Sequence, residues 1–165
     1  PLGFVFYLSA RINKMSVASA QITFWLFASI MGLSLASIFI DFTQSSIARV
    51  FFITAGAFGG LSLYGYTTKK DLTGWGSFLF IGLIGILIAS IVNIFVASTA
   101  LQFGISVIGV LVFAGLTAYD TQRIKAMYYD GHGQEGKKAI MGALTLYLDF
   151  INLFIMLIQL FGQRR

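Results

Sequence analysis

Residues 139–161 read AIMGALTLYLDFINLFIMLIQLF, an apolar run that is interrupted by one aspartate. The run is long enough to cross a bilayer, whose core needs about 20 apolar residues in helical form. Asp149 lies about ten residues into the run, which at about 1.5 Å per residue is about 15 Å deep, near the membrane centre. A lone carboxylate there costs about 2.5 kcal/mol or more. Asp149 therefore needs a partner, a water-filled cavity or a proton.

The same run carries a polar stripe. Successive polar residues follow one another at spacings of four, three and seven, which places them on one face of a helix; they are Thr145, Asp149, Asn152 and Gln159. A polar face inside a membrane should contact other helices and not lipid. We therefore expect this helix to be central and the most buried of the bundle. A purely structural, hydrogen-bonding role for Asp149 is the alternative to a functional one.

The rest of the chain is equally apolar. Of 165 residues, 58% are hydrophobic and 10% are charged, against about 25% charged in soluble domains; the mean hydropathy is +0.87. The pattern predicts an all-α polytopic membrane protein with one transmembrane domain over residues 1–165. Residues 1–10 are interpreted as the remnant of a truncated helix, and further helices are expected at about 17–40, 48–66, 76–96 and 101–120.

Lysine and arginine in the connections predict the orientation. One side would hold eight of them, namely Arg11, Lys14, Lys69, Lys70, Arg123, Lys125, Lys137 and Lys138, and the other side would hold Arg49, Arg164 and Arg165. We expect the long loop at 121–138 in the cytoplasm and the C-terminus on the far side. A re-entrant last helix, the alternative, would change the count to ten against one. The net charge of +5 is thereby explained without nucleic acid as a partner.

Other residues have simpler interpretations. Glycines within the helices predict close packing inside the chain, the candidates being Gly56, Gly59, Gly60, Gly82 and Gly85. Asn93 is expected to form an interhelical hydrogen bond, and Arg49 is expected to extend to the far membrane surface. His132 is expected in a surface loop. Three aromatic residues suggest an interfacial belt: Tyr64, Tyr66 and Trp75.

Asp120 would end the helix at 101–120, on the segment that precedes the Asp149 helix. If these consecutive helices pack together, two carboxyl groups share one low-dielectric site, where both cannot ionise cheaply and the pair titrates as a unit. The pair would act as a proton-sensitive latch. In its charged form it would attract a hard cation, but calcium prefers six to eight oxygens. Asp120 and Asp149, with Asn152 and Thr145, supply enough for weak calcium binding only.

Three runs resemble a known family: SLYGYTTKKDL at 62–72, GLTAYDTQ at 115–122 and ALTLYLDFINLF at 143–154. They are similar to the bacterial branch of the transmembrane Bax inhibitor motif (Bax inhibitor-1) family, over essentially the whole chain. The resemblance implies a fold of seven helices in which the last is surrounded by the other six. Set against that fold, we expect this sequence to lack the first helix and most of the second, together with an arginine of the second helix that the resemblance implies would engage the aspartates.

The resemblance also implies a function. Asp120 and Asp149 match paired aspartates that form a pH-sensing latch on a calcium leak, with Tyr119, Thr145 and Asn152 as supporting polar residues. It implies a bacterial inner membrane protein without a cofactor, whose partners are the bilayer and calcium as the permeant ion. The alternative is a non-conducting regulator that binds a membrane-bound, ATP-dependent quality-control protease.

No enzymatic activity is expected. An intramembrane aspartyl protease is rejected because its second aspartate lies in Gly-x-Gly-Asp, whereas Tyr147 and Leu148 precede Asp149 here. Such enzymes also carry a proline-bearing loop, and the only proline of this chain is Pro1.

The charge asymmetry gives a direct prediction of topology. The chain has no cysteine, so a Gln134→Cys variant carries one labelling site in the 121–138 connection. We expect an impermeant thiol reagent to leave this cysteine unmodified when applied from the periplasmic side. Modification from that side would reverse the orientation.

Overall fold

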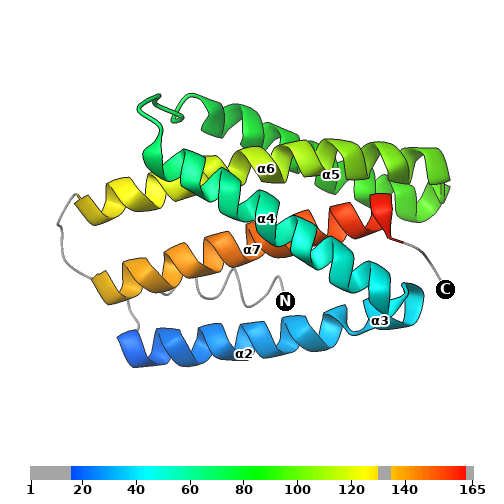
Figure 1. The fold of residues 1–165 in the computed structure, drawn as a ribbon, viewed down its shortest axis with the longest axis horizontal. Helices are drawn as coiled ribbons and strands as arrows, with labels where there is room; N and C mark the ends of the chain where they lie inside the picture. Colours follow the sequence, from blue (N-terminus) through cyan, green and yellow to red (C-terminus); the bar gives the residue numbers. More distant parts are fainter. Residues whose placement is uncertain (1–15, 130–134, 163–165) are drawn as a thin grey trace.

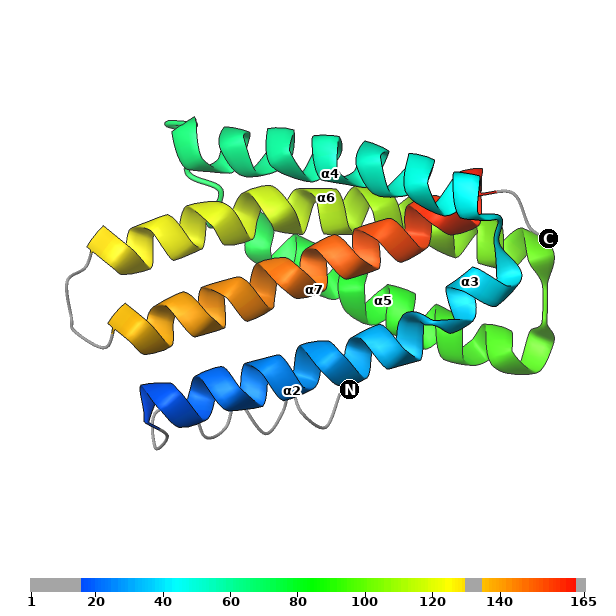
Figure 2. The ribbon, with the colours of Figure 1, turned by 60° about the horizontal axis from the view of Figure 1, so that its bottom comes forward.

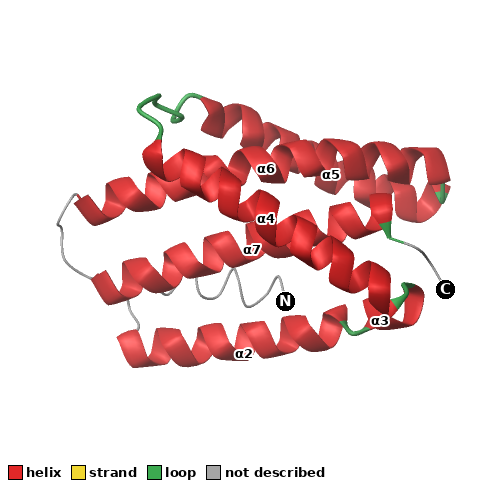
Figure 3. Ribbon diagram, viewed as in Figure 1, coloured by secondary structure: helices red, strands yellow, loops and turns green. Residues whose placement is uncertain are grey.

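The apolar segments form long helices. The structure is a computed structural model that describes residues 16–129 and 135–162. Its helices are α2 (Val17–Leu35), α3 (Ser37–Asp41), α4 (Gln44–Thr67), α5 (Trp75–Val96), α6 (Thr99–Tyr129) and α7 (Glu135–Phe161). Only helices and short connections occur among the described residues (Figure 3). Five spans are long and apolar enough to cross a membrane, with α2 and α3 forming one of them.

Helix α7 lies at the centre of the bundle. It packs against α2, α4 and α6, whereas α5 packs mainly on α6 (Figures 1 and 2). Among the five spans, that of α7 has the largest buried share. The α2 contact buries Phe27 and Leu144, and Phe27 meets the ring of Tyr147 edge to face at 5.9 Å between centroids. The prediction that the last helix is the most buried is confirmed.

Polar residues just outside the apolar runs set the helix starts. The Thr43 hydroxyl accepts a hydrogen bond from the Ser46 N–H, so α4 begins at Gln44, four residues before the expected start. Ala97 ends α5 in the left-handed conformation, with φ 54°. Ser98 then accepts a hydrogen bond from the Leu101 N–H at the start of α6. This tight reversal makes α5 and α6 antiparallel neighbours.

The expected boundary of the helix at 101–120 is wrong. Helix α6 continues nine residues beyond Asp120 to Tyr129, and α7 begins at Glu135 and not at 139. Most of the expected loop at 121–138 is therefore helical. Its polar residues fit a helix because they reach neighbouring backbone: the Lys125 ammonium donates to the Tyr66 carbonyl at 2.7 Å, and that of Lys138 donates to the Met127 carbonyl at 3.2 Å.

The two ends of the bundle differ in charge, as the sequence suggests. The α4–α5 connection, the end of α6 and the start of α7 lie at one end of the bundle (Figure 1), which carries Lys69, Lys70, Arg123, Lys125 and Lys138. The end of α7 lies at the opposite end, where the Arg49 guanidinium donates to the Phe161 carbonyl at 3.4 Å. Helix α7 is continuous across the bundle, so a re-entrant last helix is wrong. His132 and the 1–10 remnant lie outside the described residues.

The glycines that pack are mostly not the expected ones. Gly56, Gly59, Gly60 and Gly85 have open space where a Cβ atom would stand, so their predicted packing role is wrong for the described part of the chain. Gly82 does lie against Val112. The closest approach is that of Gly65, on which a Cβ atom would collide with the backbone of Ala118. Hydropathy spacing does not reveal which face of a glycine-rich helix meets a neighbour.

The Gly65 crossing gives the second prediction. Gly65→Ala should destabilise the bundle by about 1–3 kcal/mol, because α4 and α6 must move apart to admit the methyl group. Gly60→Ala, a matched change on the same helix in open space, should be neutral or slightly stabilising because alanine favours helix. Thermal unfolding of both variants in the same detergent measures the difference. Equal melting temperatures for the two variants would contradict the close crossing.

Candidate functional site: a carboxyl pair between two central helices

The site is built on the contact between α6 and α7. Asp120 projects from α6 and Asp149 from α7, and the two carboxyl groups are near enough for one to donate a hydrogen bond to the other when it carries a proton. The side chains are 6% and 5% exposed. A hydrogen bond between two carboxyl groups requires a proton on one of them. The arrangement is therefore compatible with one negative charge, and a second would bring like charges together in a buried place.

Asp120 reaches this depth because it lies within its helix. Nine residues of α6 follow it, which is about 13 Å of helix. The expectation that it ends a helix is wrong. Because α6 and α7 run antiparallel and both extend past the apolar core, Asp120 can meet Asp149 well below the helix ends.

The polar neighbours on α7 are occupied within their own helix. The Thr145 hydroxyl donates to the Met141 carbonyl at 2.9 Å, and the Asn152 amide donates to the Leu148 carbonyl at 2.8 Å. Asp149 Oδ2 has no hydrogen-bond partner among the described residues. Two carboxyl groups with a few further oxygens fall short of the six to eight that calcium prefers. The part of the chain that the structure describes also holds no cluster of three or more His, Cys, Asp or Glu side chains.

Tyr119 and Arg123 flank the pair on α6 differently. A Cβ atom on Gly76 would meet the Tyr119 hydroxyl, so the Tyr119 side chain lies against α5, away from the carboxyl pair. Adjacent residues on a helix point about 100° apart, which accounts for the separation. Arg123, three residues beyond Asp120, is near enough for its charge to act on that carboxyl group.

Beyond the carboxyl pair, the seam between α6 and α7 is apolar. Thr117 is fully buried and its hydroxyl donates to the Phe113 carbonyl of its own helix at 2.8 Å. Phe113 and Leu153 belong to one buried cluster, and a Cβ atom on Gly109 would meet the Met156 side chain. In this conformation, apolar packing blocks the seam on the far side of the carboxyl pair.

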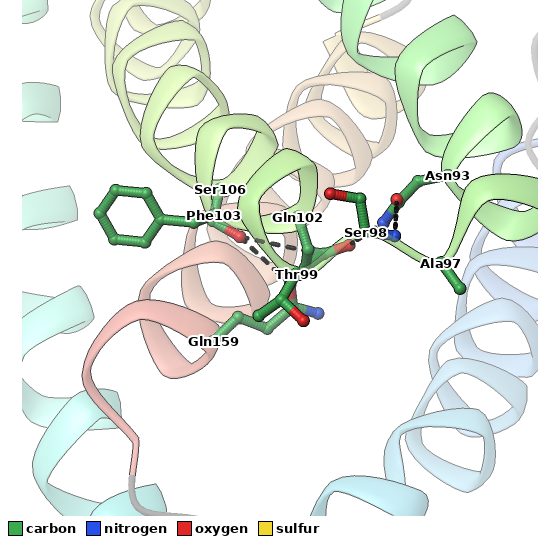
Figure 4. A pocket seen from close by; sticks show the side chains of 8 residues that line it. All are labelled: Asn93, Ala97, Ser98, Thr99, Gln102, Phe103, Ser106 and Gln159. Carbon is green, nitrogen blue, oxygen red and sulfur yellow. Dashed lines mark hydrogen bonds between the residues drawn. The ribbon is translucent and has the colours of Figure 1, made fainter.

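A second polar group closes the far end of the seam, around a cavity of about 430 Å³ (Figure 4). Gln102 donates to the side-chain oxygen of Gln159 across the two helices, and the Ser106 hydroxyl donates to the same oxygen at 3.2 Å. Asn93 of α5 donates to Gln102 at 3.3 Å, which confirms its expected interhelical hydrogen bond. Gln102 and Ser106 were not predicted from the sequence. Their spacing of four on the Asp120 helix is the signal that could have revealed them.

Comparison with known proteins identifies the fold family. The profile of the family described as inhibitor of apoptosis-promoting Bax1 matches residues 1–165. The chain belongs to the Bax inhibitor-1 family. It is 53% identical to the inner membrane protein YbhL of Escherichia coli strain K12, over 99% of this chain and 72% of that protein. It is 54% identical to an uncharacterized protein of Caulobacter vibrioides, over 100% and 67% of the two chains.

A relative from Streptococcus pyogenes, an uncharacterized membrane protein, is 40% identical over 96% of this chain and 69% of its own length. With five candidate spans in the structure and a relative named for the inner membrane, this Bax inhibitor-1 family chain is a multi-pass inner membrane protein. The family and the localisation that the sequence predicted are confirmed.

The amide contact at the far end gives the third prediction. Gln102→Leu and Gln159→Leu should each destabilise the protein, and the double variant should lose less than the sum. Polar contacts between membrane helices are coupled by about 0.6 kcal/mol on average. Unfolding in detergent measures the cycle, with Gln21→Leu, a change on the exposed face of α2, as the control. Strictly additive losses would show that the two amides do not act together.

Proposed function

We propose that the protein is a pH-sensitive cation leak, with calcium as the permeant ion, whose latch is the hydrogen bond between Asp120 and Asp149. The observation that carries the proposal is the contact of two buried carboxyl groups from consecutive, central helices. A bond that holds two helices together only while it contains a proton makes the helix contact depend on pH. Loss of that proton creates two adjacent negative charges, which repel each other.

The surroundings support a closed state. The seam is polar at the carboxyl pair and at the Gln102–Gln159 contact, with apolar packing between them. An ion can pass only if α6 and α7 move apart through that apolar stretch. Deprotonation at higher pH supplies a separating force at the carboxyl pair, and the exposed carboxylates then attract the cation. Acid should favour closure.

An ion leak of this kind requires few groups or partners beyond the carboxyl pair. It requires no catalytic residue and no bound cofactor, because the ion is carried through and not transformed. The bilayer and calcium are the required partners. Weak binding at Asp120 and Asp149 suits passage, since a tight site with six to eight oxygens would retain the ion.

Calcium flux into liposomes from about pH 6 to pH 8 gives the fourth prediction. Wild-type flux should rise with pH, by at most about tenfold per unit if one proton is released. Asp120→Asn and Asp149→Asn keep a hydrogen bond possible and remove the repulsion, so each should flatten the response. The double variant should add little, because the pair acts as a unit.

The control is Asp41→Asn, which removes an exposed carboxyl group at the end of α3 and should leave the pH response intact. If Asp120→Asn and Asp149→Asn keep the wild-type response, the pair is not the sensor. Absence of flux at every pH, together with co-purification of a membrane-bound ATP-dependent protease, would favour the non-conducting regulator.

A further inference from the structure

A groove lies on the opposite side of α6 from the carboxyl pair. Helices α4 and α5 both pack on α6 but make little contact with each other, and α6 lies between them in Figure 2. The space has a volume of about 360 Å³. Its floor is made of small residues of α6, namely Ala114, Gly115 and Ala118. Because these side chains are small, they leave open a space that larger side chains would fill.

The groove is amphipathic along its length. Apolar side chains of Leu61, Leu79 and Leu111 line the part further from the α4–α5 connection, and Tyr64, Lys70, Trp75 and Tyr119 line the part nearer to it, which we call the mouth. From Ala118 to Leu111 the floor extends about 10 Å along α6. The groove therefore extends from the lysine-rich end of the bundle toward its middle, over part of the roughly 15 Å that one leaflet of the hydrocarbon core spans.

The lysine at the mouth is held in place. Gln122 of α6 accepts a hydrogen bond from the Leu72 N–H and donates to the Lys70 carbonyl, both at 2.8 Å. The Lys70 ammonium lies 5.9 Å from the centre of the Trp75 ring and has no carboxylate partner among the described residues. The adjacent Asp71 carboxylate is engaged by the Thr73 N–H and hydroxyl. Those bonds hold the pKa of Asp71 below its usual value, and Asp71 does not line the groove.

We infer that this groove is a binding site for one anionic phospholipid of the cytoplasmic leaflet. An acyl chain fits the apolar wall and the phosphate meets Lys70 and the tyrosine hydroxyls. The choice of an anionic lipid follows from charge: the unpaired lysine lies at the lysine-rich end of the bundle, which the charge bias assigns to the cytoplasm. Anionic lipids concentrate in that leaflet and gain about 1 kcal/mol per nearby lysine. The inference does not depend on the ion leak.

Trp75 reports on the groove directly, which gives the fifth prediction. The chain has two tryptophans, so Trp25→Phe leaves Trp75 as the only one. In phosphatidylcholine vesicles, brominated phosphatidylglycerol should quench Trp75 with an apparent association about fivefold stronger than that of brominated phosphatidylcholine. Lys70→Gln should abolish this preference, so that the two brominated lipids associate about equally well. Lys69→Gln, a matched change at an exposed neighbour outside the groove, should retain it.

Two further variants test the shape of the site. Ala114→Phe fills the groove and should abolish the preference, whereas Ala57→Phe on the exposed face of α4 should not. Trp75→Phe leaves Trp25, 68% exposed on α2, which should show no lipid preference. If Lys70→Gln and Lys69→Gln reduce the lipid preference equally, the preference comes from diffuse surface charge, and the proposed site is overturned. Absence of quenching by either brominated lipid would also overturn it, because protein would then cover the groove.

Discussion

A carboxyl group far from water must be compensated, and in this chain the compensation is a second carboxyl group on the neighbouring helix. Asp149 could have been neutralised by a basic residue, but in the described part of the chain it meets Asp120. The choice has structural consequences, because a carboxyl pair shares one proton and keeps its bond only while that proton is present. Helix α7 must then be central, since its polar face has to be covered by protein along its whole length.

Hydrogen bonds join α6 and α7 at both ends of their seam, in addition to the contact at the carboxyl pair. At the charged end, Lys138 of α7 donates to the Met127 carbonyl of α6, and at the other end Gln102 meets Gln159. Neither of these hydrogen bonds involves a carboxyl group. A change in pH that loosens the centre leaves the ends joined, so the seam is suited to a local separation and not to a dissociation of the two helices.

Hydropathy and residue spacing were enough to predict five spans, the central position of α7 and the interhelical bond of Asn93. They misplaced the end of α6, because an apolar run ends at the membrane surface while the helix continues. The polar residues after Asp120 stay helical by bonding to backbone that is remote in sequence, as Lys125 does with Tyr66. Gln102 and Ser106 were missed for a related reason. Their importance depends on Gln159 of another helix, and a single polar residue in a span does not reveal its partner.

One turn of α6, residues 117–120, is in contact on three sides. Ala118 lies against Gly65 of α4, Tyr119 against Gly76 of α5, and Asp120 against Asp149 of α7. The first two contacts are tight and contain no titratable hydrogen bond, whereas the third depends on a proton. When the third contact fails, this turn should therefore separate locally from α7 while it stays joined to α4 and α5 as one unit. The lipid groove lies within that unit, with Ala118 and Tyr119 among its lining residues. An occupant of the groove would stiffen the unit without entering the seam, so lipid and proton would act on the same turn from opposite sides.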